Sequence, residues 1–550
     1  MTDIRMTEHL GFLKADVGAA LAELERDRVV RRLWAKDHTL WKPDPKEIAD
    51  RLGWLTVAGR MQREVGRLTS FAQSIRKAGF TSVVLLGMGG SSLGPEVLRC
   101  TFGSARGYPR LCVLDSTVPG IVRDVTRAIR PARTLFILAS KSGGTIEVMS
   151  LFAHFWKVVA KTKGNTGGAQ FIAVTDPGTG LASLAQQRRF REIFLNQPDI
   201  GGRYSVLSHF GMVPAALTGL DLTEFLTRGV EMAALCGPET SPVENPGARL
   251  GAIMGTLARS GRDKVTVVAS PKIKTFGLWA EQLLAESTGK EGRGLVPIAD
   301  EPLASEKAYG SDRLFVYLRL NGDANSVTDR HVRALERAGQ PVVRLTLRDR
   351  YDLAAEFFRW EFATAVAGRL LGIHPFDQPN VQESKENTAR ILEAVKTQGR
   401  VPPAVDADTP AELLAKAAPG KYVAILAYMR FSAKTDAAIR ALRKTILTRH
   451  RVATTAGYGP RYLHSTGQLH KGGPDTGLFL ELIEPMTPDV PIPDAPYTFG
   501  LLAEAQSVGD WQSLRAHHRP VVRLPLGRQP QAQIKRLLQR TNRPRRAGSS

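Results

Sequence analysis

Two segments rich in glycine and hydroxyl side chains offer the groups that bind a phosphate. The first is Gly87-Met88-Gly89-Gly90-Ser91-Ser92, and the second is Ser140-Lys141-Ser142-Gly143-Gly144-Thr145. Each follows an apolar run and precedes a helical pattern, so its backbone N–H groups should lie at a helix N-terminus, where the dipole is positive. One such turn is explained by a tight connection alone. Two turns of the same chemistry predict a pocket for a phosphorylated, hydroxyl-rich ligand.

Four later stretches carry side chains that could act on such a ligand. In the first, two glycines let the backbone approach a ligand beside a permanent cation. The four stretches are Gly201-Gly202-Arg203-Tyr204-Ser205, Trp279 to Lys290 with Glu286, His374 to Lys385 with Gln378, and Leu463 to Gly473 with His464 and His470.

Each of these residues also has an ordinary structural interpretation. Glu286 and Lys290 are four residues apart, the spacing of a helical ion pair worth a few tenths of a kcal/mol. Arg203 alone reads as a surface charge, and Lys385 lies in a polar run typical of a solvated helix. Gly87-x-Gly89 is weak evidence for a dinucleotide site, because Ser92 stands at the third glycine position. We therefore expect no NAD.

The elements that must position these residues alternate between strands and helices from Thr81 onward. This alternation predicts a doubly wound parallel α/β sheet with ligands at the carboxyl ends of its strands. The expected strands are Val83–Leu86, Leu111–Leu114, Leu135–Ala139 and Phe171–Thr175, then Val265–Ala269, Leu314–Leu320 and Val342–Leu347, and finally Tyr422–Met429, Phe479–Ile483 and Val521–Leu524.

Two linker-like stretches, Cys236–Gly247 and Gly399–Pro410, suggest four segments. We expect a helical N-terminal segment over 1–75, a first α/β domain over 76–240, a second over 245–398, and an accessory C-terminal α/β segment over 405–550. A basic helix is expected near Asp436–Arg449, and a basic tail runs from Lys535 to Arg546.

Composition fits a globular chain of several domains: 550 residues, of which 43% are hydrophobic. No apolar run approaches the roughly 18 residues of a membrane span. The N-terminus lacks a secretory pattern, and the three cysteines have no metal-ligand spacing. We expect a cytoplasmic, thiol-reduced protein that binds neither a metal nor a membrane.

The net charge of +22 allows two interpretations. One is a nucleic-acid-binding surface. The other is an arginine-rich solvated surface that favours encounter with anionic substrates. The basic residues are scattered and accompany no nucleic-acid-binding motif. We therefore expect no specific nucleic-acid partner.

Together the motifs resemble those of the glucose-6-phosphate isomerase family, which has two sugar-isomerase (SIS) domains. Five occur in the family's order over roughly residues 50–390: Gly-x-Gly-Gly-Ser, Ser-Lys-Ser/Thr, Gly-Gly-Arg-Tyr-Ser, Glu-Ser-x-Gly-Lys, and Phe-Asp-Gln with a lysine seven residues on. Trp34-Ala35-Lys36-Asp37 and Trp41-Lys42-Pro43 also resemble the join in fused transaldolase/glucose-6-phosphate isomerase proteins, here without the transaldolase half.

The resemblance implies a role for each matching residue. Glu286 would be the base that moves a proton between C2 and C1, and Arg203 would stabilise the enediolate. The chemistry is sound, because a proton next to a carbonyl is weakly acidic and needs both a base and a partner for the oxyanion. Lys385 would assist ring opening. The substrate-binding residues would be Gly90, Ser91, Ser140, Lys141, Ser142, Thr145, Gly202 and Gln378.

The sequence departs from the family's pattern at the histidine that opens the sugar ring. It normally follows the base, but no histidine lies between Glu286 and His331. The remaining candidates are His464 and His470 in the C-terminal segment, and we favour His464. It would reach the site from this segment or from a partner subunit.

The resemblance implies a glycolytic and gluconeogenic isomerase that interconverts glucose 6-phosphate and fructose 6-phosphate through a cis-enediol, needs no cofactor, and forms a homodimer. The fold would contain two SIS-type doubly wound parallel-sheet domains. Two alternatives stay open. One is a non-catalytic SIS protein that senses sugar phosphates, and the other is an isomerase that also accepts mannose 6-phosphate.

Overall fold

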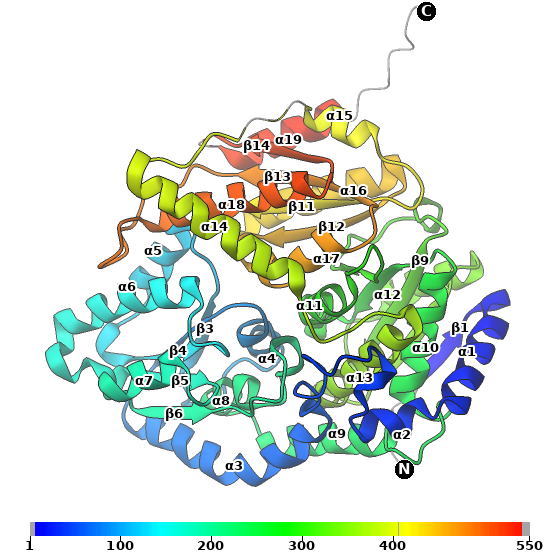
Figure 1. Ribbon diagram of the computed structural model, residues 1–550, viewed down its shortest axis with the longest axis horizontal. Coiled ribbons are helices and arrows are strands. Elements are labelled where there is room, and N and C mark those ends of the chain that lie inside the picture. The colour runs from blue at the N-terminus through cyan, green and yellow to red at the C-terminus, as the bar shows by residue number, and fades with distance from the viewer. Residues whose placement is uncertain (1–5, 405, 407, 528, 542–550) are drawn as a thin grey trace, which may run out of the picture.

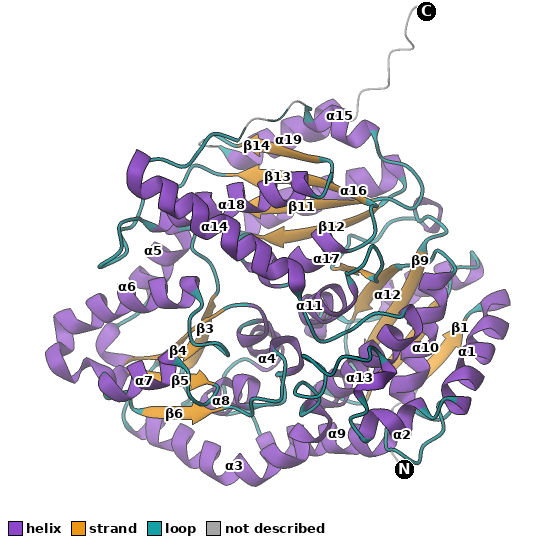
Figure 2. Ribbon diagram, viewed as in Figure 1, coloured by secondary structure: helices purple, strands orange, loops and turns teal. Residues whose placement is uncertain are grey.

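The computed structural model describes residues 6–404, 406, 408–527 and 529–541. It contains three β-sheets, each accompanied by helices and arranged around a common centre (Figure 1). Neighbouring strands in these sheets are parallel, apart from one antiparallel pair at the edge of the second sheet (Figure 2). Several strands are nearly continuous apolar runs, as expected for parallel strands covered on both faces.

The first sheet has the strand order β3-β2-β4-β5-β6. Strand β3 lies on one side of β2 and strand β4 lies on the other. The direction of the chain across the sheet therefore reverses between β2 and β4, which creates a topological switch point at the carboxyl ends of these two strands. The strands are β2 (Ser82–Gly87), β3 (Arg110–Leu114), β4 (Thr134–Ala139), β5 (Phe171–Thr175) and β6 (Glu192–Leu195). The helices between them are α4 (Leu93–Phe102), α5 (Pro119–Ala128), α6 (Ile146–Lys163) and α7 (Gly180–Gln187).

The second sheet has the order β1-β10-β9-β7-β8, with β1 antiparallel at its edge. Its strands are β1 (Met6–His9), β7 (Lys264–Ala269), β8 (Val296–Ala299), β9 (Arg313–Leu320) and β10 (Val342–Leu347). The associated helices are α10 (Pro246–Arg259), α11 (Phe276–Thr288), α12 (Ser326–Arg337) and α13 (Leu353–Leu371). Strand β1 belongs to the N-terminal stretch, which is otherwise helical: α1 (Lys14–Arg26), α2 (Val29–Trp34) and α3 (Trp54–Lys77).

The third sheet, formed by the C-terminal part of the chain, has the order β12-β11-β13-β14 and is parallel throughout. Its strands are β11 (Tyr422–Tyr428), β12 (Ala453–Tyr458), β13 (Gly477–Ile483) and β14 (Val521–Pro525). Its helices are α15 (Pro410–Ala415), α16 (Ala433–His450), α17 (Gly467–Gly472), α18 (Phe499–Ala516) and α19 (Pro530–Thr541). The remaining helices are α8 (His209–Leu217), α9 (Leu222–Leu235) and α14 (Pro379–Gln398).

The hydrophobic cores tie the three sheets together. One continuous core joins the first two, because Val83 of β2 and Val265 of β7 belong to the same cluster of buried side chains. The opposite face of the first sheet packs against α14 and α18, through residues such as Val395 and Phe499. Helices α14 and α18 lie side by side above it (Figure 1). Helix α18 thus joins the third sheet to the first, and a further buried cluster joins β11 of the third sheet to β8 of the second.

All ten strands expected from the sequence are present, and four were not expected: β1, β6, β8 and β12. The expected basic helix is α16. The basic tail is helical up to Thr541, and its remainder, 542–546, lies outside the described residues. No helix within the described part of the chain is long and apolar enough to cross a membrane.

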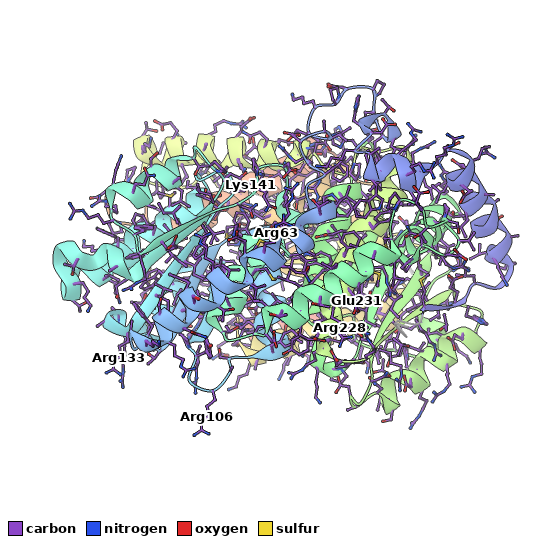
Figure 3. The ribbon with its side chains drawn as sticks, turned by 90° about the horizontal axis from the view of Figure 1, so that it is seen from below. Arg63, Arg106, Arg133, Lys141, Arg228 and Glu231 are labelled. Carbon is purple, nitrogen blue, oxygen red and sulfur yellow. The ribbon has the colours of Figure 1, made fainter. Side chains whose placement is uncertain are left out.

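The basic charge is distributed over several segments. Arg106 and Arg133 project outward from the first sheet's side of the molecule, and Arg63 lies on α3 (Figure 3). Other arginines are paired: Arg228 of α9 contacts carboxylates of Glu224, Asp349 and Asp352.

Candidate active site

A cavity of about 580 Å³ lies at the carboxyl ends of the first sheet's strands, against α11, α14 and the loop between β12 and α17. It brings together residues that are hundreds of positions apart in the sequence. Every site residue expected from the sequence lines it: Gly90, Ser91, Ser140, Lys141, Ser142, Thr145, Gly202, Arg203, Glu286, Gln378, Lys385 and His464.

The first glycine-rich loop needs its glycines because other loops press against it. A Cβ atom on Gly90 would lie 1.9 Å from the backbone oxygen of Gly202. Gly89 has a φ of +55°, and a Cβ there would lie 2.7 Å from the backbone oxygen of His464. The loop therefore packs directly against the two segments that carry Arg203 and His464.

The second loop ends at the N-terminus of α6, the position expected for a phosphate. Ser140 Oγ lies 2.9 Å from Thr145 Oγ1 and accepts a hydrogen bond from the backbone N–H of Gly143 at 3.1 Å. These contacts pre-organise the loop, and the α6 dipole adds positive potential.

Lys141 is less available than the sequence indicates. Its Nζ pairs with the carboxylate of Asp176 and donates to the backbone oxygen of Pro198 at 2.9 Å. Burial raises the pKa of Asp176, although the lysine opposes that shift. Lys141 brings a cation to the cavity, but with a carboxylate beside it.

Glu286 projects from α11 into the cavity and faces Arg203. The separation between Glu286 Oε1 and Arg203 Nη1 is 3.3 Å, and Gln282 Nε2 donates to Glu286 Oε2 at 2.9 Å. The helical ion pair with Lys290 that the spacing allowed does not form. Lys290 instead donates to the backbone oxygens of His374 and Asp377 at 2.5 and 2.6 Å and pairs with the Asp377 carboxylate.

The guanidinium of Arg203 is buried and held from several sides. Its Nε donates to Ser287 Oγ at 2.7 Å, and its Nη1 donates to Gln378 Oε1 at 2.7 Å. Its Nη2 donates to the backbone oxygens of Pro375 and Asp377 at 2.7 and 3.0 Å. These bonds fix a permanent cation, with little freedom to move, beside the carboxylate of Glu286.

The Phe376-Asp377-Gln378 segment is fixed by the same groups. Lys290 lies beneath it, and burial lowers the pKa of this lysine to about 7 even though Asp377 opposes the shift. Gln378 precedes α14, and Lys385 lies on an exposed position of that helix, at the cavity rim.

The two candidate histidines occupy different environments. His464 lines the cavity, and its Nε2 lies 2.8 Å from Glu147 Oε1. His470 is buried in α17, where its ring packs against Phe479, and neither ring nitrogen has a hydrogen-bond partner among the described residues. The geometry favours His464, and it reaches the cavity from the same chain.

Glu147 is not among the site residues expected from the sequence, although it lies just after the second loop motif. It is 3% exposed and accepts hydrogen bonds on one oxygen from His464 and from Gln506 Nε2, the latter at 2.7 Å. Burial alone would raise its pKa, but His464 and then Lys385 outweigh burial, so the pKa lies below its usual range. A carboxylate in the first turn after a phosphate-type loop is the signal that could have found it.

Other cavity residues were also missed: Asp50, Arg51, Asp176, Thr179 and Gln282. Gln282 had a detectable signal, because it lies one helical turn before Glu286 on the same face. Asp50 and Arg51 had none, because they belong to a polar stretch whose path only the fold determines.

Comparison with known proteins shows which family the chain resembles. The model of the family described as phosphoglucose isomerase matches residues 56–294. A glucose-6-phosphate isomerase of Rubrobacter xylanophilus is 29% identical over 424 residues, which are 68% of this chain and 95% of the relative. One of Carboxydothermus hydrogenoformans is 26% identical, over 63% of this chain and 86% of the relative. The chain is therefore similar to the phosphoglucose isomerase family over residues 56–294, and to glucose-6-phosphate isomerases over most of their length.

Solved structures share the fold. A hypothetical protein of Thermus thermophilus superposes with a TM-score of 0.62 at 23% identity, covering 70% of this chain and 99% of the other. A glucose-6-phosphate isomerase of Chlamydia trachomatis gives 0.60 at 19% identity, covering 69% of this chain and 86% of the other. The residues matched by the family model include Arg203 and Glu286, whereas Gln378, Lys385 and His464 lie beyond them.

Proposed function

We propose that this chain interconverts glucose 6-phosphate and fructose 6-phosphate, with Glu286 as the base. The observation that carries the proposal is the pairing of Glu286 with the fixed cation Arg203 in a cavity that also contains both phosphate-type loops. A binding protein would need the loops alone. A carboxylate next to a cation that cannot give up its proton is what enolisation requires.

In this mechanism the phosphate binds to the hydroxyls and N–H groups of residues 140–145 at the start of α6. That anchor places the sugar carbons against α11 and reduces the entropic cost of reaching the transition state. Gly90, Ser91, Gly202 and Gln378 contact the sugar chain.

Ring opening breaks the bond between C1 and the ring oxygen of the aldose. One proton moves from the C1 hydroxyl to the ring oxygen. Because the Nε2 proton of His464 is directed to Glu147, its Nδ1 is left to take this proton from the C1 hydroxyl and return it to the ring oxygen. The ammonium of Lys385 supports the oxygen that accumulates charge.

Isomerisation then moves one proton. Glu286 removes it from C2, the electron pair forms the C1–C2 double bond, and the negative charge develops on oxygen opposite Arg203. Glu286 returns the proton to C1 while the hydroxyl proton moves from O2 to O1. The product is the ketose, and the enzyme returns to its starting state.

A coupled assay tests the function. Fructose 6-phosphate is supplied and glucose 6-phosphate is detected with a dehydrogenase, using wild type, Glu286→Gln, and Glu291→Gln as a matched control. Glu291 lies just past α11 and pairs at the surface with Lys42. We expect turnover in wild type and in the control and its loss in Glu286→Gln. A wild type that is stabilised by fructose 6-phosphate without turnover would identify a sensor instead.

Several finer assignments are part of this proposal. They are a cytoplasmic location, a homodimer, the absence of a specific nucleic-acid partner, the four-segment division, and the resemblance to the isomerase half of transaldolase fusions. Mannose 6-phosphate in the same assay reports whether the C2 epimer is also accepted.

A further inference from the structure

Two side chains from the C-terminal part of the chain contact Glu147. His464 follows β12, at the carboxyl end of that sheet, and Gln506 lies in the middle of α18. Both contact Glu147 Oε1, at 2.8 and 2.7 Å, while Glu147 itself belongs to the first sheet's helix α6. The histidine and its carboxylate therefore come from parts of one chain that are more than three hundred residues apart.

The hydrogen bonds fix the orientation of the Gln506 amide. An ionised carboxylate can only accept, so the amide NH₂ must face Glu147. The amide oxygen then accepts from Thr117 Oγ1 at 2.8 Å. Thr117 is fully buried and Gln506 is 2% exposed, so neither contact competes with bulk water. The series of hydrogen bonds through Thr117, Gln506, Glu147 and His464 therefore allows the Glu147 carboxylate only one orientation.

The loop that carries His464 is also clamped to the rest of the site. Arg461 forms a bidentate ion pair with Asp115, just beyond β3, at 2.7 and 2.8 Å. The backbone oxygen of His464 accepts from Gln282 Nε2 of α11 at 2.9 Å. The loop is therefore held by the first sheet on one side and by the helix of Glu286 on the other.

We infer that the C-terminal part of the chain completes the catalytic site in cis, with Gln506 as a positioning residue that holds Glu147 toward His464. The inference rests on the proposed function. It predicts that one folded chain contains a whole site, whatever its oligomeric state. If a second copy supplied the histidine, that histidine would have to displace His464 from its observed contact with Glu147.

Complementation between two inactive chains tests the cis arrangement. Glu286→Gln and His464→Ala are co-expressed with different affinity tags, and the doubly tagged species is purified through both. We expect no more turnover than either variant gives alone, since every site contains one of the substitutions. Recovery of about half the wild-type turnover would overturn the inference, because a shared site would pair the intact Glu286 of one chain with the intact His464 of the other.

Two controls make every result informative. Doubly tagged wild type must be active; an inactive wild type would refute the function itself and the inference with it. If no doubly tagged species is obtained, the specific activity of wild type is followed on dilution to nanomolar concentration. Constant activity per chain supports the cis site, and loss of activity on dilution contradicts it.

Gln506→Met tests the positioning role, because methionine keeps the length of the side chain and removes the amide. The matched control is Gln340→Met, whose amide donates to the backbone oxygen of Gly310 at 3.2 Å, outside the cavity lining. We expect kcat of Gln506→Met to fall about tenfold, the effect of losing a hydrogen bond to a charged group. KM and the far-ultraviolet circular dichroism should be unchanged.

The pH profile separates positioning from packing. His464 and Lys385 are the basic side chains that act on Glu147, and both remain in Gln506→Met. Without the amide donor, the acid limb of kcat/KM should move to higher pH. A variant with wild-type kcat and an unshifted limb would overturn the role of Gln506, and the Gln340 control should change neither quantity.

Discussion

Glu286 Oε1 lies 3.3 Å from Arg203 Nη1, although the nearest basic residue in its own helix register is Lys290. Lys290 faces the other way and holds the Asp377 loop, which in turn binds the back of the Arg203 guanidinium. The two cations thus have separate tasks. One fixes a loop, and the other stands opposite the carboxylate where charge develops in the proposed reaction.

Lys385→Met should remove activity without affecting the fold. Lys385 is exposed on α14 and has no ion pair among the described residues, so its replacement should change the free energy of unfolding by about 0.5 kcal/mol or less. We expect kcat for fructose 6-phosphate to fall about a hundredfold. Lys396→Met, at an exposed position of the same helix, is the control. Equal activity of the two variants would exclude Lys385 from the mechanism.

Gly90→Ala should damage both stability and activity. The added Cβ would lie 1.9 Å from the backbone oxygen of Gly202, so the two loops must separate, at a cost of about 3 kcal/mol. Gly66 lies on an exposed turn of α3, where an added Cβ would meet no neighbouring side chain or loop within 4 Å. Gly66→Ala should therefore stabilise the protein by about 0.5–1 kcal/mol. Urea titration measures both. A Gly90 variant as stable as wild type would show that the loops can part freely.

Asp176→Asn should tighten substrate binding. The carboxylate of Asp176 neutralises Lys141 at the cavity, and removing one negative charge a few ångströms from the phosphate favours binding by about 1 kcal/mol, or roughly fivefold in KM. Asp124→Asn, which breaks the surface pair with Arg430, is the matched control. An increased KM in Asp176→Asn would mean that Asp176 is needed to position Lys141.

Glu281 should make stability depend on pH. It is buried on α11, and burial raises its pKa from 4.5 to about 8, although Arg443 and Arg461 oppose the shift. Because the folded-state pKa is above the unfolded value, the contribution of Glu281 is fully present below about pH 4.5 and is lost as pH rises through about 8. Melting temperatures of wild type and Glu281→Gln should therefore diverge between pH 5 and 9 in favour of the variant. Parallel curves would show that Glu281 is already ionised at pH 5.

The sequence was sufficient where local patterns determine the structure. Apolar runs such as Thr134–Ala139 indicated the buried parallel strands, and the loops after β2 and β4 followed from them. Strand β8 (Val296–Ala299) was missed because it is only four residues long and contains Pro297, which weakens the strand signal. Two other missed strands lack a continuous apolar run. Glu192–Leu195 is short with a half-exposed pattern, and Met6–His9 alternates at an antiparallel edge.

The site was predictable as far as motifs reach, and the remainder depends on tertiary structure. No local signal connects Gln506 with Glu147, because only the packing of α18 beside the first sheet brings them together. The pairing of Lys141 with Asp176 is equally invisible in the motif. The sequence favoured His464 over His470, but it did not reveal that His470 is buried away from the cavity.

In the proposed reaction Glu286 carries the proton between C2 and C1. Turnover of fructose 6-phosphate in ²H₂O, followed by NMR, tests it most directly. We expect deuterium to enter C2 of glucose 6-phosphate with wild type, because the proton on Glu286 can exchange with solvent. We expect Glu286→Gln to give neither product nor label. Wild-type turnover without any label, or labelling at an undiminished rate in Glu286→Gln, would contradict this role of Glu286.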